Sequence, residues 1–294
     1  MKSSEAETAQ LMDDYSLEMT AKDIESLTSA SNAISTGTSI SVTFLPGEAM
    51  PARVAAATAV KKLGYLPVPH ISARRLGSRE ELTEFLGKLH DSVGIDSAFV
   101  VAGDPLEPMG PFEDALSIIE SGELEKFGVK SVGISGYPEG HPSIPRPKLW
   151  AALKAKHRAL TELGHDIQIV TQFTFDSDPV LQWLERVRQE AGIDAIVRVG
   201  LPGPASVKTL LRFAMRCGVA ASAKVMAKYG TSITQLLNTA GPEKLIEEFG
   251  DRLDPRIHGD VQFHFYPFGG LKRTAEWVAN YREGRSEGSR RVAD

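Results

Sequence analysis

Three side chains in this sequence stand where an apolar run gives way to polar residues, and each could take part in chemistry. Glu18 lies within YSLEM, where an ionised carboxylate without a partner costs several kcal/mol. Such surroundings suit a general acid, and an exposed glutamate at a strand edge is the alternative. Asp104 follows the run FVVAG and precedes a proline, which places it on a turn after a strand, although such turns also form without any ligand. Gln172, in IQIVTQFTFD, offers an acceptor and a donor side by side, which suits the edge of a heterocycle.

Other polar residues follow apolar runs in the same way. His70 and Ser72 end the run LPVPHIS, and Tyr137 and His141 lie in YPEGHPSIP, a loop that its prolines stiffen. Each histidine taken alone is more often structural than ligand-binding. The polar residues and glycines at the strand ends are, in chain order, Glu18, Thr43, His70, Ser72, Gly103, Asp104, Tyr137, Glu139, His141, Thr171, Gln172, Gly200 to Gly203 and His264 to Tyr266.

A basic segment, LKAKHR at 153–158, is expected near the start of the helix that follows the fifth apolar run. Cations at a helix N-terminus oppose the helix dipole, so a bound anion could compensate Lys156 and its neighbours. A solvated basic face is the more common explanation of such a run. An acid, a second carboxylate, an amide and a basic rim together indicate a pocket for a flat polar heterocycle that carries phosphates.

Eight short apolar runs must position these residues. They lie at 15–19, 40–45, 66–72, 98–103, 132–136, 167–173, 195–200 and 261–268. Helical patterns separate them, including one that a Ser78 and Glu81 capping box opens and Gly94 ends, and others at 148–163, 178–192 and 205–217.

The strict alternation of strand and helix predicts an α/β protein with a parallel sheet, and eight repeats predict closure into a (β/α)8 TIM-type barrel. Extra helices are expected at 221–258, before the last strand. An open doubly wound sheet is the alternative, but no Gly-x-Gly-x-x-Gly follows a strand. In a closed barrel the carboxyl ends of the strands carry the chemistry, which is where the predicted residues lie.

Composition narrows the function. The 294 residues carry a formal net charge of −5, which argues against nucleic acid as a partner. Cys217 is the single cysteine, so neither an internal disulfide nor a zinc site is expected, and no metal is predicted. Neither a secretory signal nor a long apolar span is present, so we expect a cytoplasmic protein that does not enter membranes. One barrel domain is expected over residues 14–281, between flexible tails at 1–13 and 282–294.

The motifs resemble, in the same order, those of the methylenetetrahydrofolate reductase family of flavin-containing (β/α)8 barrels, as in a divergent short bacterial-type member. The segments are TFLPGE, PHIS, VVAGDP, SGYPEGHP, VTQFTFD, VGLPGPASV and HFYPFGG. The resemblance runs from about residue 18 to residue 277. The segments are specific as an ordered set, whereas any one of them alone would be weak.

The resemblance implies a role for each matching residue. Glu18 would supply the proton as the methylene bridge of the folate opens, and Asp104 would tune the flavin and favour the folate cation. Gln172 would pair with the pterin, and Tyr266 would contact the substrate. FAD would be held by Thr43, His70, Ser72, Gly103, Asp104, Tyr137 and His141, with Lys156 near its pyrophosphate.

Departures from the family pattern bear on the reaction. The usual Arg-Gly-Asp begins with Ala102 here, and no aromatic residue lies near Ala205 to Val207, where one typically stacks on the nicotinamide. The resemblance thus implies a flavin-dependent oxidoreductase of one-carbon metabolism that interconverts 5,10-methylene- and 5-methyltetrahydrofolate. The missing aromatic residue favours a variant of this function, in which the protein oxidises methyltetrahydrofolate with an acceptor other than NAD(P), such as an electron-transfer partner protein.

The first strand reads LEMTA rather than the family's FEFFPP, and this change, with the lost arginine, favours an alternative. In that alternative the chain is a folate-binding barrel without catalysis of its own that serves as a partner subunit. A homo-oligomer is expected. An aldolase or lyase of the Schiff-base type is not supported, because no lysine stands at a strand end.

Overall fold

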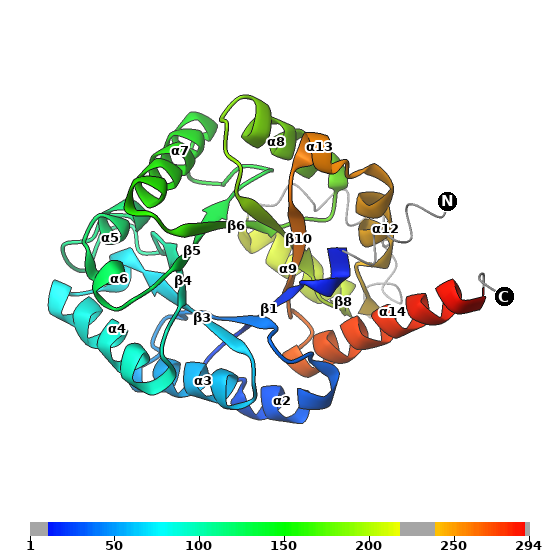
Figure 1. Ribbon diagram of the computed structural model, residues 1–294, viewed down its shortest axis with the longest axis horizontal. Coiled ribbons are helices and arrows are strands. Elements are labelled where there is room, and N and C mark those ends of the chain that lie inside the picture. Colours follow the sequence, from blue (N-terminus) through cyan, green and yellow to red (C-terminus); the bar gives the residue numbers. More distant parts are fainter. Residues whose placement is uncertain (1–10, 218–238, 292–294) are drawn as a thin grey trace.

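Eight parallel strands close into a barrel at the centre of the part of the chain that is described (Figure 1). The computed structural model describes residues 11–217 and 239–291, with side chains up to residue 284. The barrel strands are β1 (Ser16–Met19), β2 (Ser39–Val42), β3 (Leu66–Ser72), β4 (Ser97–Val101), β5 (Ser131–Gly136), β6 (Asp166–Phe173), β7 (Ile196–Pro202) and β10 (Val261–Tyr266). Their order around the barrel is β1-β10-β7-β6-β5-β4-β3-β2. The predicted (β/α)8 architecture is confirmed, and the open sheet is excluded.

Helices fill the connections and surround the strands (Figure 1). They are α2 (Ile24–Ser29), α3 (Met50–Lys62), α4 (Arg79–Val93), α5 (Ala115–Ile119), α6 (Glu123–Lys126), α7 (Arg146–Leu163), α8 (Ser177–Gln189), α9 (Val207–Cys217), α12 (Glu243–Arg252), α13 (Pro255–His258) and α14 (Leu271–Arg291), with 3-10 turns η1 (Ser31–Ala33) and η2 (Ala73–Arg75). A small antiparallel sheet, β8 (Ala205–Ser206) and β9 (Thr239–Ala240), lies outside the barrel. Helices α12 and α13 precede the last strand, as predicted, and 221–238 of that predicted segment lie outside the described residues.

Alternation along the strands decides which side chains reach the inside of the barrel. In β10, the ring centroid of Phe263 lies 5.9 Å from that of an aromatic residue of α12, and the ring of Phe265 lies 5.9 Å from one in α14. These two side chains point outward into the helical layer. His264 and Tyr266 therefore point into the barrel.

Local signals set several helix ends. The side chain of Ser78 accepts a hydrogen bond from the backbone N–H of Glu81 (3.2 Å) at the start of α4. Gly94 ends this helix in the left-handed conformation, with a φ of 59°. Both predicted signals are confirmed. Helix α8 begins after Asp176, whose side chain caps it, and ends at Gln189, short of the glycine predicted to stop it.

Helix α7 begins earlier than the sequence suggested. It starts at Arg146 with a proline in its first turn, a position where the missing N–H of proline costs nothing. The basic segment 153–158 consequently lies in the middle of the helix rather than at its start. The prediction that these cations stand at the helix N-terminus is therefore wrong, and no bound anion is needed there to compensate them.

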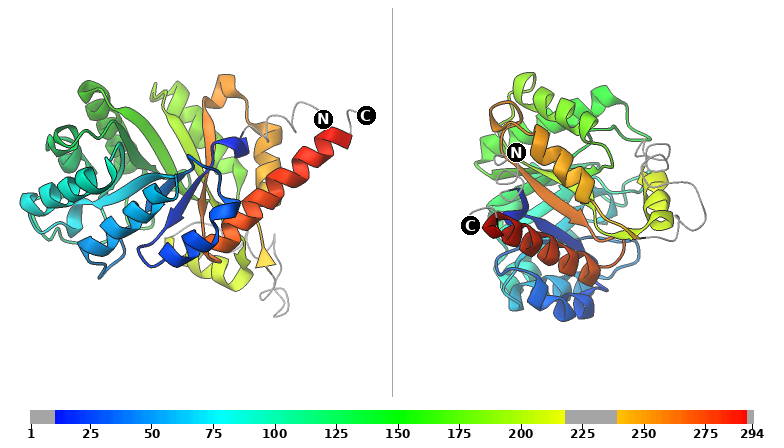
Figure 2. Two further views of the ribbon diagram at one scale, coloured as in Figure 1. Left: turned by 60° about the horizontal axis from the view of Figure 1, so that its bottom comes forward. Right: turned by 90° about the vertical axis from the view of Figure 1, so that its right-hand side faces the viewer.

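The two predicted tails differ from the observed ends of the fold. Helix α14 runs to Arg291, so the predicted tail 282–294 begins inside a helix that extends away from the barrel (Figure 2). No proline interrupts this segment, and its arginines and glutamates favour helix. At the other end, residues 11–13 are helical and Met12 is buried in the core, so the predicted flexible segment 1–13 ends before residue 13. Each helix within 11–217 and 239–291 is too short or too polar to cross a lipid bilayer.

Candidate active site

The first and last barrel strands bring an acid and a histidine together. Strands β1 and β10 are neighbours, and their register pairs Ser16 with His264. Nδ1 of His264 lies 2.8 Å from the Ser16 hydroxyl, and its Nε2 lies 3.6 Å from Oε2 of Glu18, whose side chain is 21% exposed. The ring of His264 is thus held between two side chains on the same face of β1. It is 2% exposed and cannot turn freely.

His70, on β3, lies near Glu18 and His264. Burial lowers the pKa of His70 from 6.5 to about 4, an effect that Glu18 opposes and His264 increases. The ring lies 4.6 Å from that of Phe99, between centroids. His70 is therefore neutral near pH 7 and presents one donor and one acceptor nitrogen.

Tyr266 lies above His264 on the same face of β10. Its hydroxyl donates to the backbone carbonyl of Thr171 at the end of β6 (2.9 Å), and its ring meets that of His264 edge-on at 4.8 Å. Burial raises the pKa of Tyr266 well above 10.0, and the nearby Glu18 and Tyr137 raise it further. The phenol is therefore neutral and held in place by its hydrogen bond to Thr171.

The rim is formed by the loops after β4 and β5. Asp104 is 80% exposed, and its Oδ2 lies 3.3 Å from Nη2 of Arg75 in η2, whose side chain is only 14% exposed. Burial raises the pKa of Tyr137. A hydrogen bond from Ser135 lowers this pKa, and the charge of Asp104 raises it. Tyr137 meets His141 edge-on, with ring centroids 5.4 Å apart.

Three further predicted residues lie at the ends of β2, β3 and β4. The hydroxyl of Thr43 donates to the carbonyl of Met19 (3.2 Å), which ties β2 to β1. The hydroxyl of Ser72 is buried without a hydrogen-bond partner. It faces Gly103, whose φ is +93° and where an added Cβ would overlap the Ser72 oxygen. A ligand could form a hydrogen bond with this hydroxyl and approach the backbone at Gly103, which carries no side chain.

Gln172 lies where β6 is irregular. The pairing of β6 with β7 shifts register between Val170 and Phe173. Oε1 of Gln172 accepts a hydrogen bond from the backbone N–H of Phe173 (3.2 Å). The side-chain oxygen of Gln172 is thus partly used within the strand. Of the predicted donor and acceptor of this side chain, chiefly the amide N–H groups remain for a ligand.

The structure does not bring Lys156 together with the other predicted residues. Lys156 lies ten residues after Arg146, about 15 Å along the helix from its first turn. It is buried, and burial lowers its pKa to about 8, an effect that Asp114 at the start of α5 opposes. Electrostatic interactions, in contrast, connect Glu18 with His70 and Tyr266, and connect Tyr137 with Tyr266 and Asp104.

The lowered pKa of His70 predicts a pH dependence of stability. The pKa of His70 is about 4 in the folded protein, against an ordinary value of 6.5, so the unfolded chain binds more protons between these pH values. Stability should therefore fall by about 2–3 kcal/mol as the pH drops from about 7 to about 4.5. Urea unfolding at both pH values should show a smaller fall for His70→Gln than for the wild type. Equal falls in the two proteins would show that His70 does not carry this effect.

Comparison with known proteins identifies the lineage of this barrel. The sequence model of the methylenetetrahydrofolate reductase family matches residues 9–275. The chain belongs to this family. Methylenetetrahydrofolate reductase 2 of Saccharomyces cerevisiae is 29% identical over 133 residues, which are 42% of this chain and 21% of that protein. Methylenetetrahydrofolate reductase (NADH) 1 of Arabidopsis thaliana is 26% identical over 149 residues, 46% of this chain and 25% of that protein. The match thus spans only about a quarter or less of these relatives.

A solved structure shares the fold. An uncharacterised Clostridium thermocellum protein that binds two copies of 5-methyl-5,6,7,8-tetrahydrofolic acid superposes with a TM-score of 0.60. The alignment covers 92% of this chain and 94% of that one, at 10% sequence identity. At this identity the similarity concerns the barrel architecture.

Family membership puts two features of the site in context. The arginine that the methylenetetrahydrofolate reductase pattern has before Gly-Asp is replaced by Ala102, but Arg75 places a cation beside Asp104 from another turn of the chain. From the sequence alone, no role is assigned to His264, which the structure places in contact with Glu18. Its spacing of two from Tyr266 was the available signal, since residues two apart share a strand face.

Proposed function

We propose that this member of the methylenetetrahydrofolate reductase family is an FAD-dependent oxidoreductase that interconverts 5,10-methylene- and 5-methyltetrahydrofolate. We propose that it works in the methyl-oxidising direction. The observation that carries the proposal is the arrangement of Glu18, held beside His264 and facing His70 and Tyr266, at the carboxyl end of a barrel of this family. Binding of 5-methyltetrahydrofolate by the Clostridium thermocellum barrel is consistent with a folate ligand.

The residues at the ends of β3 and β4 fit a flavin. The partnerless hydroxyl of Ser72 and the bare backbone at Gly103 offer a polar atom and the space to reach it. Thr43, His70, Tyr137 and His141 would hold the remainder of the ring system and its chain, with Asp104 at the rim. When bound, the flavin supplies the exchange of a hydride with the folate. Arg75, rather than Lys156, is the cation at this rim that suits a phosphate.

Glu18 would take part in proton transfer. Oxidation of the methyl group to a methylene bridge removes a hydride from the methyl carbon and a proton from the second folate nitrogen, N10, as the bridge closes. We assign this proton to Glu18, which returns it in the reverse reaction. Gln172 would donate to the pterin, and Tyr266 would hold the plane of the substrate.

The proposed acceptor follows from the start of α9. The aromatic residue that the family pattern typically has near Ala205 to Val207 is missing from this stretch, and the side chain of Val207 is buried in a cluster with Phe173 and Leu210. Residues 205–207 thus offer no ring on which a nicotinamide could stack. We propose a different acceptor, supplied by an electron-transfer partner protein, and a homo-oligomer acting in the cytoplasm.

Steady-state kinetics test the proposal. The flavin-loaded protein should oxidise 5-methyltetrahydrofolate with an artificial dye as acceptor, and the rate with NAD+ or NADP+ should be at least about 10-fold lower. With a dye that accepts two electrons, formation of 5,10-methylenetetrahydrofolate should equal the dye reduced, mole for mole. Absence of turnover with every acceptor, while 5-methyltetrahydrofolate still binds, would favour the folate-binding barrel without catalysis.

His264 is proposed as a positioning residue for Glu18. In His264→Gln, loss of the fixed ring should lower kcat about 10- to 100-fold, with a smaller change in KM. The affinity for 5-methyltetrahydrofolate should stay close to the wild-type value, because His264 contacts Glu18 at 3.6 Å and acts through it. A rise in KM with an unaltered kcat would indicate that His264 only supports the fold.

A further inference from the structure

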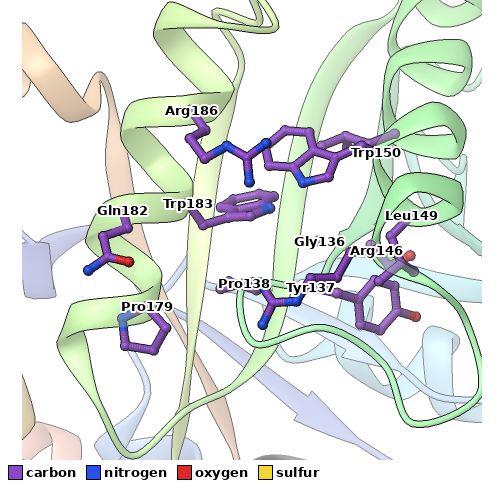
Figure 3. Close-up of a pocket in the computed structure, with 12 residues that line it drawn as sticks. Gly136, Tyr137, Pro138, Arg146, Leu149, Trp150, Pro179, Gln182, Trp183 and Arg186 are labelled. Atoms are coloured by element: carbon purple, nitrogen blue, oxygen red, sulfur yellow. The ribbon is translucent and has the colours of Figure 1, made fainter.

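A cavity lies in the helical layer, outside the barrel. It has a volume of about 160 Å³ and is enclosed by α7, α8 and the end of β5. The side chains that decide its chemistry are Tyr137, Arg146, Trp150, Gln182, Trp183 and Arg186 (Figure 3). Its residues include none of those that bind or react in the proposed mechanism apart from Tyr137.

The indole rings of Trp150 and Trp183 form one wall of the cavity. The ring centroids of Trp150 and Trp183 are 6.0 Å apart, with 33° between their planes. Trp183 packs so closely on β5 that an added Cβ at Gly136 would lie 2.8 Å from its ring. The indole surface is therefore preformed, and a flat ring can pack on it without reordering the helices.

Two guanidinium groups make the cavity basic. Cζ of Arg186 lies 4.7 Å from the centre of the Trp150 ring, and its Nε binds Glu190, which leaves its terminal nitrogens for other partners. Arg146 donates to the backbone carbonyl of Glu139 (3.1 Å). The carboxylate of Glu139 accepts from Thr174 instead.

No aspartate or glutamate is among the described residues that line the cavity. Arginine pairs well with carboxylates and also stacks on aromatic faces. The volume is below the roughly 300–1,000 Å³ of sites for drug-sized molecules. The cavity thus selects an anion with about one ring.

We propose that this cavity binds a small aromatic carboxylate, at a site distinct from that of the folate. The ring would pack on the indoles of Trp150 and Trp183, and the carboxylate would bind Arg146 and Arg186. Gln182 is available for a hydroxyl or amino substituent. Residues 136–138 form both a wall of this cavity and the start of the loop that carries Tyr137 and His141, so the ligand would contact a segment that supports the proposed flavin site.

Calorimetric titration of the full-length, flavin-loaded protein with 4-hydroxybenzoate tests the proposal. We expect a dissociation constant on the order of 1 mM or tighter. The neutral analogue 4-hydroxybenzyl alcohol should bind at least about 10-fold more weakly, because it lacks the charge that the arginines recognise. Arg146→Gln should also weaken 4-hydroxybenzoate about 10-fold or more. Arg158→Gln, an exposed arginine of the same helix that pairs with Glu162, should leave the affinity unchanged.

Several results would overturn the proposal. These are no heat of binding at millimolar 4-hydroxybenzoate, equal affinity for the acid and the alcohol, or an unchanged affinity in Arg146→Gln. Displacement of the probe by 5-methyltetrahydrofolate would place it in the folate site and would also overturn the proposal of a separate one. Because the readout is binding, a failure here leaves the proposed folate oxidation untouched, and a failure of that reaction leaves this site untouched.

Discussion

Replacing Glu18 with glutamine is expected to slow the oxidation of 5-methyltetrahydrofolate by at least about 100-fold, the usual contribution of a general acid or base. Glutamine has the shape of glutamate and can still contact His264, but it cannot take up the proton. The fold and the binding of folate should survive, because the side chain contacts His264 at 3.6 Å and is partly exposed rather than packed in the core. Single-turnover rates with the dye acceptor, measured beside folate affinity, separate the loss of chemistry from a loss of binding.

A matched substitution controls for the loss of one carboxylate. Glu25 is exposed on α2, outside the barrel interior, so Glu25→Gln should turn over at the wild-type rate. A Glu18→Gln enzyme that retains more than about a tenth of the wild-type rate would remove Glu18 from the chemistry. In that case another group in the site would have to carry the proton.

A methyl group at Gly200 is expected to destabilise the protein by about 1–3 kcal/mol, the usual cost of overpacking, and to weaken folate binding. Its Cβ would lie 2.6 Å from the carbonyl oxygen of Thr171 and 2.7 Å from Cε2 of Tyr266. The carbonyl belongs to the β6 backbone at the irregular register, so it cannot rotate away. Relief requires that Tyr266 and the strand end carrying Gln172 move apart. Urea unfolding and folate titration of Gly200→Ala measure the two effects.

The same substitution at an open position is the control. An added Cβ at Gly284 in α14 meets nothing within 4 Å. Gly284→Ala should therefore raise the free energy of unfolding by about 0.5–1 kcal/mol. Alanine fits the helix at this position and has fewer conformations than glycine in the unfolded chain. Stability and folate affinity at wild-type values in Gly200→Ala would mean that the end of β6 and Tyr266 are not held as tightly as the distances imply.

The barrel was predictable because its signals are local. Each strand is a short apolar run bounded by turn residues, and the cap at Ser78 and the stop at Gly94 act within one helical turn. The start of α7 was misplaced although its signal was present, since a proline directly after Arg146 is typical of a first helical turn. Because of that error, Lys156 was predicted to lie near the mouth of the barrel, whereas it lies in the middle of α7.

The arrangement of the site was less predictable because it depends on register and packing between distant segments. Nothing local states that Ser16 pairs with His264, since these residues are joined only by closure of the barrel. The contact of Arg75 with Asp104 likewise depends on how η2 meets the loop after β4. The basic aromatic cavity arises from the packing of α7 against α8, which helical periodicity does not specify.

The most direct test of the folate and flavin assignment is anaerobic mixing of the flavin-loaded protein with 5-methyltetrahydrofolate, followed by the visible absorbance of the flavin. The residues around Glu18, His70 and Tyr266 predict that the absorbance bleaches as 5,10-methylenetetrahydrofolate forms in equal amount. They also predict that Glu18→Gln binds the folate but bleaches at least about 100-fold more slowly. An unchanged flavin spectrum in wild-type protein that has demonstrably bound 5-methyltetrahydrofolate would contradict the account.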